Sequence, residues 1–126
     1  MTLPDDGVQT PRAPDGIRCA GGLLIASSAV GARHTLRLHG ELDLASAAEL
    51  VASAGLLVSD ATEIVLDLSG LEFMDSTGIN AIMRLRDLCR SQQCRLLLAS
   101  PKRQVRRLLE VTALIEPMRD EGLLAD

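Results

Sequence analysis

The sequence predicts an α/β protein with a mixed sheet of four to five strands and helices packed mainly on one face. Two observations lead to this fold class. After two strand-like segments, short apolar runs alternate with segments of helical periodicity, which gives the order ββαβαβαβ. The chain has 126 residues, with a single Phe and no Trp or Tyr, so one domain must build its core from aliphatic side chains.

The first part of the chain predicts a tail followed by a β-hairpin. Residues 1–17 contain three prolines and no apolar periodicity, so we expect a flexible tail there and a single domain over residues 18–126. Leu23–Ala26 is a short apolar run typical of a strand, and Ser27–Gly31 suggests a turn. Thr35–His39 alternates apolar and polar residues, which is the period of a half-buried strand.

The next segments predict a helix and a buried strand. Ser46 and Glu49 have the spacing of a capping box, in which each side chain satisfies a backbone donor at the start of a helix. Apolar residues from Ala47 to Val58 recur at helical spacing. Ile64–Leu68 is short and rich in branched aliphatic residues, so we expect a buried strand that ends there and a loop through Gly70.

A second helix is predicted from Asp75 or Ser76 to about Arg90, because Asp, Ser and Thr are good capping residues. At 100° per residue, one stripe of this helix should face the sheet, and it consists of Gly78, Ala81, Ile82, Leu85, Leu88 and Cys89.

The last third of the chain predicts a further strand, a helix and an edge strand. Arg95–Ala99 is the strand. Ser100 and Pro101 suggest an N-cap followed by Pro at the first helical position. Leu114–Ile115 could form a last strand, which Pro117 would confine to an edge of the sheet.

Composition excludes several function classes. The formal net charge of −4, the pI of about 5.1 and the lack of aromatic stacking platforms argue against nucleic-acid binding. No apolar stretch is long enough for a membrane span, and the first residues do not resemble a secretory signal. Three cysteines without an export signal are typical of reduced thiols, so we expect a cytoplasmic protein.

The net charge conceals an asymmetry. Residues 38–80 contain eight acids and no Lys or Arg, for a charge of −8, whereas residues 81–109 contain eight bases and one acid, for a charge of +7. In one interpretation the two halves neutralise each other across the surface of the domain. In the other, an acidic face and a basic face meet different partners.

No set of residues suggests an enzyme, a metal site or a bound cofactor. His34 and His39 have an odd spacing on or near one strand, so their side chains should face opposite sides of it. Cys89 and Cys94 flank the predicted end of a helix without a second pair, which favours packing over zinc binding. The sequence contains no phosphate-binding loop and no nucleophile motif.

One segment has a second interpretation besides capping. Asp75-Ser76-Thr77-Gly78 follows a strand and opens a helix, where backbone N–H groups lack partners and the helix dipole is positive. A hydroxyl there would be exposed, rigidly oriented and able to carry a phosphate. Gly78 would let another backbone approach the first turn.

Together the motifs resemble those of a known family. Glu41-Leu42-Asp43, Ser46-Ala47, the run from Phe73 to Gly78, and Ser100-Pro101 before a basic helix are similar to the STAS family, and in particular to bacterial anti-sigma factor antagonists, over about residues 21–119. The resemblance implies a non-enzymatic protein, a monomer when alone. It would bind an anti-sigma factor when unphosphorylated and so release a sigma factor.

The resemblance also implies roles for individual residues. Ser76 would be phosphorylated by the anti-sigma factor, acting as a serine kinase, and a PP2C-type phosphatase would reverse this. Asp75 would orient Ser76, and Asp43 on a neighbouring loop would face the partner. Thr77 would be a secondary acceptor, and Gly78 would lie in the same partner-facing segment.

Ile79 and Met83 lie outside the predicted sheet-facing stripe, one turn apart. Two placements remain open: they pack against a neighbouring helix, or they form an exposed apolar patch that docks the partner. Departures from the family pattern are Pro117, the short segment after it, and the N-terminal tail. The alternative function is a STAS scaffold without a switch, in a signalling assembly or a lipid-transport complex. A nucleotide-binding or enzymatic role is a third reading, which the missing phosphate loop disfavours.

Overall fold

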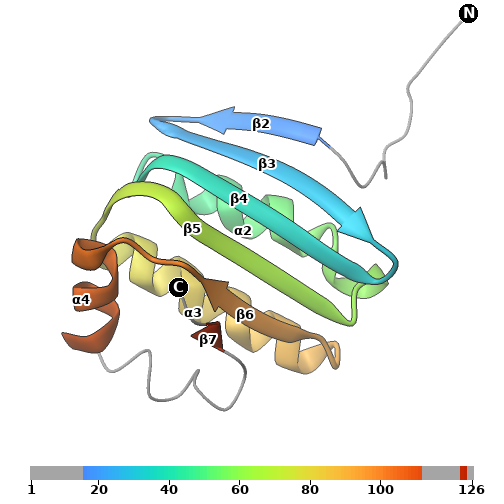
Figure 1. Ribbon diagram of the computed structural model, residues 1–126. Helices are drawn as coiled ribbons and strands as arrows, with labels where there is room; N and C mark the ends of the chain where they lie inside the picture. The colour runs from blue at the N-terminus through green and yellow to red at the C-terminus, as the bar shows by residue number, and fades with distance from the viewer. Residues whose placement is uncertain (1–15, 112–122, 125–126) are drawn as a thin grey trace, which may run out of the picture.

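A computed structural model describes residues 16–111 and 123–124, which form a mixed sheet covered on one face by helices (Figure 1). The strands, in their order across the sheet, are β2 (Gly16–Ala20), β3 (Leu23–Val30), β4 (Arg33–Leu42), β5 (Glu63–Met74), β6 (Arg95–Ala99) and β7 (Leu123–Leu124). The helices are α2 (Ala47–Gly55), α3 (Ser76–Ser91) and α4 (Arg103–Val111), with the short 3-10 helix η2 (Val58–Asp60) after α2.

The predicted mixed α/β sheet is confirmed. Strands β2, β3 and β4 pair antiparallel, and β4, β5, β6 and β7 pair parallel. The described residues contain one strand more than the expected maximum because β2 adds to the predicted hairpin. That strand begins at Gly16, so the last two residues of the expected tail belong to the sheet.

The predicted turn at Ser27–Gly31 is wrong. Strand β3 continues to Val30, with Ser27 opposite Leu36 on β4. The unpredicted strand β2 pairs with this segment and places Gly16 opposite Ser27, so β3 has a pairing partner on each side. The turn itself falls at Gly31, which has a φ of +61° and therefore favours a residue without a Cβ.

The predicted end of the third strand at Leu68 is also wrong. Strand β5 runs on to Met74, and its pairing with β4 shifts register between Arg37 and His39 and again between Gly40 and Glu41. Each shift adds a residue to β5, as a β-bulge does. The bulges allow Leu68, Leu71 and Met74, spaced by three, all to be buried on the same side as the core.

The core lies between the sheet and the helices and is aliphatic, as the composition requires. It includes the inward side chains of β3 to β6 and one face of each α-helix. Representative fully buried members are Ile25, Leu36, Leu38, Leu50, Ile64, Leu66, Ile82, Leu85, Leu96, Leu98 and Leu109. The predicted stripe of α3 is confirmed for Gly78, Ala81, Ile82, Leu85 and Cys89, with Leu88 half-buried.

The predicted capping box at the start of α2 does not form. The hydroxyl of Ser46 is buried, donates to the carbonyl of Glu41 at 2.9 Å and accepts from the amide of Asp43 at 3.1 Å. Glu49 instead accepts from the hydroxyl of Ser53 at 2.8 Å. Ser46 therefore holds the loop that precedes α2. Neither the Ser46 hydroxyl nor the Glu49 carboxylate bonds to the other residue's backbone amide, as a capping box would require.

The end of α3 explains the two neighbouring cysteines. Gln93 has a φ of +58°, and the amide of Cys94 donates to the carbonyl of Cys89 at 2.8 Å, while the amide of Gln93 donates to Arg90 at 3.2 Å. This is a Schellman motif, in which the two flanking side chains meet. Both thiols are free and buried, and burial raises the pKa of Cys89 to about 12, so they pack as small apolar groups.

The start of the last α-helix also differs from the prediction. Ser100 has a φ of +55°, and α4 begins at Arg103, so Ser100 and Pro101 belong to the preceding loop rather than to its N-cap and first turn. The amide of Arg106 donates to the carbonyl of Lys102 at 2.8 Å, which marks the first turn. The predicted strand at Leu114–Ile115 lies outside the described residues.

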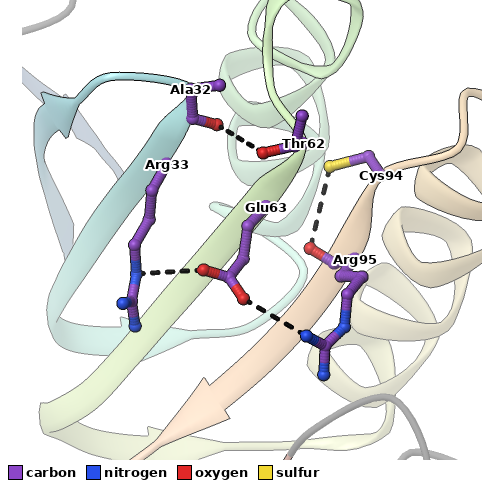
Figure 2. Close-up of polar contacts among 6 residues, drawn as sticks. All are labelled: Ala32, Arg33, Thr62, Glu63, Cys94 and Arg95. Atoms are coloured by element: carbon purple, nitrogen blue, oxygen red, sulfur yellow. Dashed lines mark hydrogen bonds and ion pairs between the residues drawn. The ribbon is translucent and has the colours of Figure 1, made fainter.

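Ion pairs partly neutralise the acidic half of the chain. On the face of the sheet away from α2 and α3, Glu63 lies between Arg33, at 3.2 Å, and Arg95, at 3.7 Å (Figure 2). Other pairs that join separate elements are Glu49 with Arg18, Asp67 with Arg37, and Glu72 with Lys102. Four acids of the acidic stretch, Glu49, Glu63, Asp67 and Glu72, are therefore neutralised by bases elsewhere on the domain. Only two of their partners, Arg95 and Lys102, come from the basic stretch.

Gly78 allows α3 to approach β4 closely. A Cβ on Gly78 would lie 2.8 Å from the carbonyl oxygen of Leu42 and 2.6 Å from Cγ of Met74. The backbone that approaches the first turn of the helix is therefore a strand of the same chain. This contact sets the distance between the start of α3 and the end of β4.

Replacing Gly78 with alanine should destabilise the domain by about 1–3 kcal/mol, because the backbone carbonyl of Leu42 cannot move aside as a flexible side chain would. Denaturant unfolding monitored by circular dichroism would measure the change. Gly55→Ala is the matched control. Its Cβ would meet only Leu88 Cδ2, at 3.6 Å, so this variant should be neutral or more stable. Equal losses in both variants would contradict the assignment of Gly78 as a packing constraint.

Candidate functional site

The predicted site residues come together at the edge of the sheet where β4 and β5 end. Leu42 on β4 is paired with Met74 on β5, so the residues that follow, Asp43 and Asp75, leave the same edge side by side. The amide of Asp75 also donates to the carbonyl of Leu42 at 3.4 Å. Two segments that are 32 residues apart in the chain thus form one surface.

Asp75 is the N-cap of α3. One of its carboxylate oxygens accepts from the amides of Thr77 at 3.0 Å and Gly78 at 3.2 Å, and from the hydroxyl of Thr77 at 2.5 Å. These hydrogen bonds, led by the one from the Thr77 hydroxyl, lower the pKa of Asp75 below its usual range. The cap is therefore a carboxylate at neutral pH, placed where the helix dipole favours negative charge.

Ser76 and Thr77 differ in how free their hydroxyls are. Ser76 is the first residue of α3 and is exposed, and within the described residues its hydroxyl makes no hydrogen bond. Thr77 is half-buried, and its hydroxyl is engaged by Asp75. Of the two, Ser76 is the hydroxyl available to another molecule.

The loop that carries Asp43 is internally braced. One carboxylate oxygen of Asp43 accepts from the amide of Ala45 at 3.0 Å, and the buried Ser46 hydroxyl holds the backbone on either side. The side chain of Asp43 is half-buried, whereas Glu41 is exposed. Among the described residues, Glu41, Asp43 and Asp75 have no ion pair, so three acids without a basic partner lie at this edge.

The remaining predicted residues divide between core and surface. Gly78 is buried against β4, and Ile79 is 5% exposed and belongs to the core. The two therefore support the site from beneath and do not present side chains to a partner. The sequence left two placements open for Ile79 and Met83, in the packed interior or in an exposed patch. Of these two residues, only Met83 is exposed, at 39%.

A groove beside the acidic edge was not predicted. It lies between the start of α2 and the first turns of α3 and has a volume of about 270 Å³. Its walls are mostly apolar, with Thr77, Asn80 and Arg84 supplying the polar groups alongside Leu44, Ala47, Ala48 and Ala81. The feature of the sequence that could have indicated this groove is the run of small residues around Ala47, because small side chains leave space between α2 and α3.

The described residues hold no set of three or more His, Cys, Asp or Glu side chains placed to bind a metal ion. His34 is buried and His39 is exposed, in agreement with the prediction that they face opposite sides. None of the helices within residues 16–111 combines the length and hydropathy needed to cross a membrane.

Comparison with known proteins identifies the family. The family model described as the STAS domain matches residues 27–120. The chain belongs to the STAS domain family. No curated protein matches this STAS domain at a significant level.

Solved structures similar to this STAS domain include anti-sigma factor antagonists. SpoIIAA in its unphosphorylated form is 19% identical with a TM-score of 0.68, covering 81% of this chain and 87% of that one. An antagonist from Mycobacterium paratuberculosis is 21% identical with a TM-score of 0.69, covering 88% of each chain. Phosphorylated SpoIIAA, described as a Bacillus cell fate determinant, is 18% identical with a TM-score of 0.64, covering 81% and 90%. At these identities the likeness establishes the fold.

The Asp75 cap should make the domain sensitive to acid in a defined direction. Because the folded-state pKa is lowered, the contribution of this carboxylate is present in full above the unfolded-state pKa of about 4 and is lost as the pH falls through the lower folded-state value. Asp75→Ala should lower the melting temperature at neutral pH. The difference from wild type should shrink in strong acid.

Thermal unfolding of both proteins across the acidic range would measure this effect. Asp75→Asn is the matched control because an asparagine oxygen still accepts from the amides but carries no charge. A constant difference between wild type and Asp75→Ala at every pH would contradict the assignment of Asp75 as an ionised cap.

Proposed function

We propose that this STAS domain is an anti-sigma factor antagonist. Unphosphorylated, it binds an anti-sigma factor and so releases a sigma factor, and phosphorylation of Ser76 switches this binding off. The observation that carries the proposal is the exposed hydroxyl of Ser76 at the first residue of α3, which bonds to no described residue and lies beside a carboxylate that already caps the helix. The domain acts by binding and performs no catalysis itself. It needs no cofactor.

The surroundings of Ser76 determine what a phosphate there would do. Phosphorylation adds about −1.5 to −2 charge at neutral pH. Asp75 already accepts from the amides of Thr77 and Gly78, so those donors are not available to capture the phosphate. The new charge would join Asp43 and Asp75 at the surface, where neither aspartate has an ion pair with a described residue. The fold should remain intact while an acidic or phosphate-bearing partner surface is repelled.

The difference between the two hydroxyls favours Ser76 over Thr77 as the acceptor. Transfer of a phosphoryl group to Thr77 would break the short hydrogen bond to Asp75 and loosen the cap. Transfer to Ser76 breaks no hydrogen bond between described residues. We therefore assign Ser76 as the phosphorylation site and regard Thr77 as part of its support.

The proposed partners follow from the same mechanism. The anti-sigma factor is a serine kinase that recognises the edge formed by Asp43, Asp75 and Ser76, and a PP2C-type phosphatase restores the binding form. The proposal assigns the protein to the cytoplasm and to the control of transcription. The similarity to antagonist structures supports the proposal at the level of fold.

Incubation with Mg-ATP and the anti-sigma kinases of the same cell should add one phosphoryl group, observed by intact mass. Ser76→Ala should accept no phosphoryl group. Thr77→Val is the matched control, because it also removes a hydroxyl but keeps Ser76, and it should still accept one phosphoryl group. If every such kinase ignores the wild-type chain and the protein co-purifies with transporter subunits, the alternative of a scaffold without a switch replaces the proposal.

Met83 provides a test of the docking surface two helical turns from Ser76. Met83→Glu should weaken binding to the anti-sigma factor by about tenfold or more while leaving the melting temperature nearly unchanged, because the side chain is 39% exposed. Ile79→Glu should unfold the domain, because Ile79 belongs to the core. Calorimetric titration and thermal unfolding would measure the two effects. A folded Met83→Glu protein with unchanged affinity would remove Met83 from the binding surface.

A further inference from the structure

The outer face of α2 lacks the charged residues that a surface helix normally carries. Between Leu44 and Val58 the only charged residue is Glu49, which is occupied by Ser53 and Arg18. A helix on the surface of a globular protein usually has charged and polar residues on its solvent side. The exposed residues here are instead Ala48 and Ala52 on α2, Leu44 and Ala45 in the turn before it, and Leu56 at its C-cap.

The spacing along this face is symmetric. Two large apolar residues at its ends, Leu44 at 80% exposure and Leu56 at 67%, flank the small residues Ala48 and Ala52 at intervals of four. An antiparallel copy of the same face would place each leucine opposite the other and the alanines at the centre. Ridges of residues four apart pack into each other at a crossing angle of about −50°.

The groove described above supplies the complementary hole. It lies at the Leu44 end of α2, where the antiparallel arrangement brings Leu56 of a second copy. Its volume of about 270 Å³ is ample for a leucine side chain, and Ala47, Ala48 and Ala81 line it. The same surface thus carries both a projecting leucine and a groove with room for a leucine side chain.

Charges at the two ends are also complementary. Arg84 lines the groove, and Asp60 follows Leu56 by one turn. Both are exposed, and neither has an ion pair among the described residues. When Leu56 of the first copy enters the groove of the second, Asp60 of the first copy approaches Arg84 of the second.

From these observations we propose that the chain self-associates through the outer face of α2 into a two-fold symmetric dimer, with Leu56 of each copy seated in the groove of the other. A two-fold interface uses the same patch on both subunits, as this face does. A single helix face is at the small end of specific interfaces, so the dimer is weak and concentration-dependent. Since Thr77 lines the groove, dimerisation covers one side of the Ser76 surface. The proposal does not depend on the function proposed above.

Sedimentation equilibrium of the full chain, without any kinase, would test the dimer. Leu56→Lys should raise the dissociation constant by about tenfold or more. Val30→Lys is the matched control, because Val30 is 84% exposed at the end of β3, outside the proposed interface, and should leave the constant unchanged. Equal behaviour of the two variants, or a wild-type chain that stays monomeric at millimolar concentration, would overturn the proposal.

A charge exchange tests the arrangement independently of the leucine. Arg84→Asp and Asp60→Arg should each weaken association by about two- to fivefold, and the double variant should restore it. Circular dichroism checks that each variant is folded. Loss without restoration in the double variant would overturn the pairing. A monomeric chain whose Leu56→Lys variant loses affinity for a different protein would assign the face to that protein instead.

Discussion

The parallel pairing of β4 with β5 is the constraint on which the rest of the site depends. It places Leu42 opposite Met74, so the two chain segments leave the sheet together. The two added residues in β5 bring the strand to this edge while keeping Leu68, Leu71 and Met74 in the core. Gly78 then allows α3 to begin directly against the last carbonyl of β4. The position of Ser76 is thus set by backbone contacts and by tight packing.

Under the proposed function, the site divides two tasks between neighbouring residues. Asp75 accepts from the amides of Thr77 and Gly78 with a carboxylate that remains ionised, while the hydroxyl of Ser76 bonds to no residue in the described part of the chain. A residue that both capped the helix and received a phosphate would couple modification to local unfolding. With the two tasks separated, a change at Ser76 alters the charge of the surface and leaves the helix in place.

The helix and strand pattern was predictable because aliphatic periodicity is strong in this chain. The sheet-facing stripe of α3 and the buried strands followed from spacing alone. The capping box at Ser46 failed because a buried hydroxyl found better partners in Glu41 and Asp43, which lie in a loop that spacing does not describe. The bulges in β5 were not predicted for a similar reason. They depend on the register between β4 and β5, which the sequence of β5 alone does not determine.

The site was partly predictable. Asp75 and Ser76 were identified from capping chemistry and family resemblance, and the structure places them together with Asp43. The burial of Ile79 could not be read from α3 alone, because the close approach set by Gly78 widens the buried stripe at that end of the helix. The groove depends on how α2 and α3 lie beside each other, which the spacing along one helix does not give.

The position of Ser76 as the first residue of a 16-residue helix has a consequence for recognition. Many modifying enzymes bind their acceptor in an extended segment, which requires the substrate chain to be pulled away from its own fold. Here the residues after Ser76 are held by the core, and those before it form the last part of β5. The kinase of the proposed switch must therefore recognise a folded surface assembled from β4, β5 and α3. Short peptides with the same local sequence lack that surface and should be poor substitutes for the intact domain.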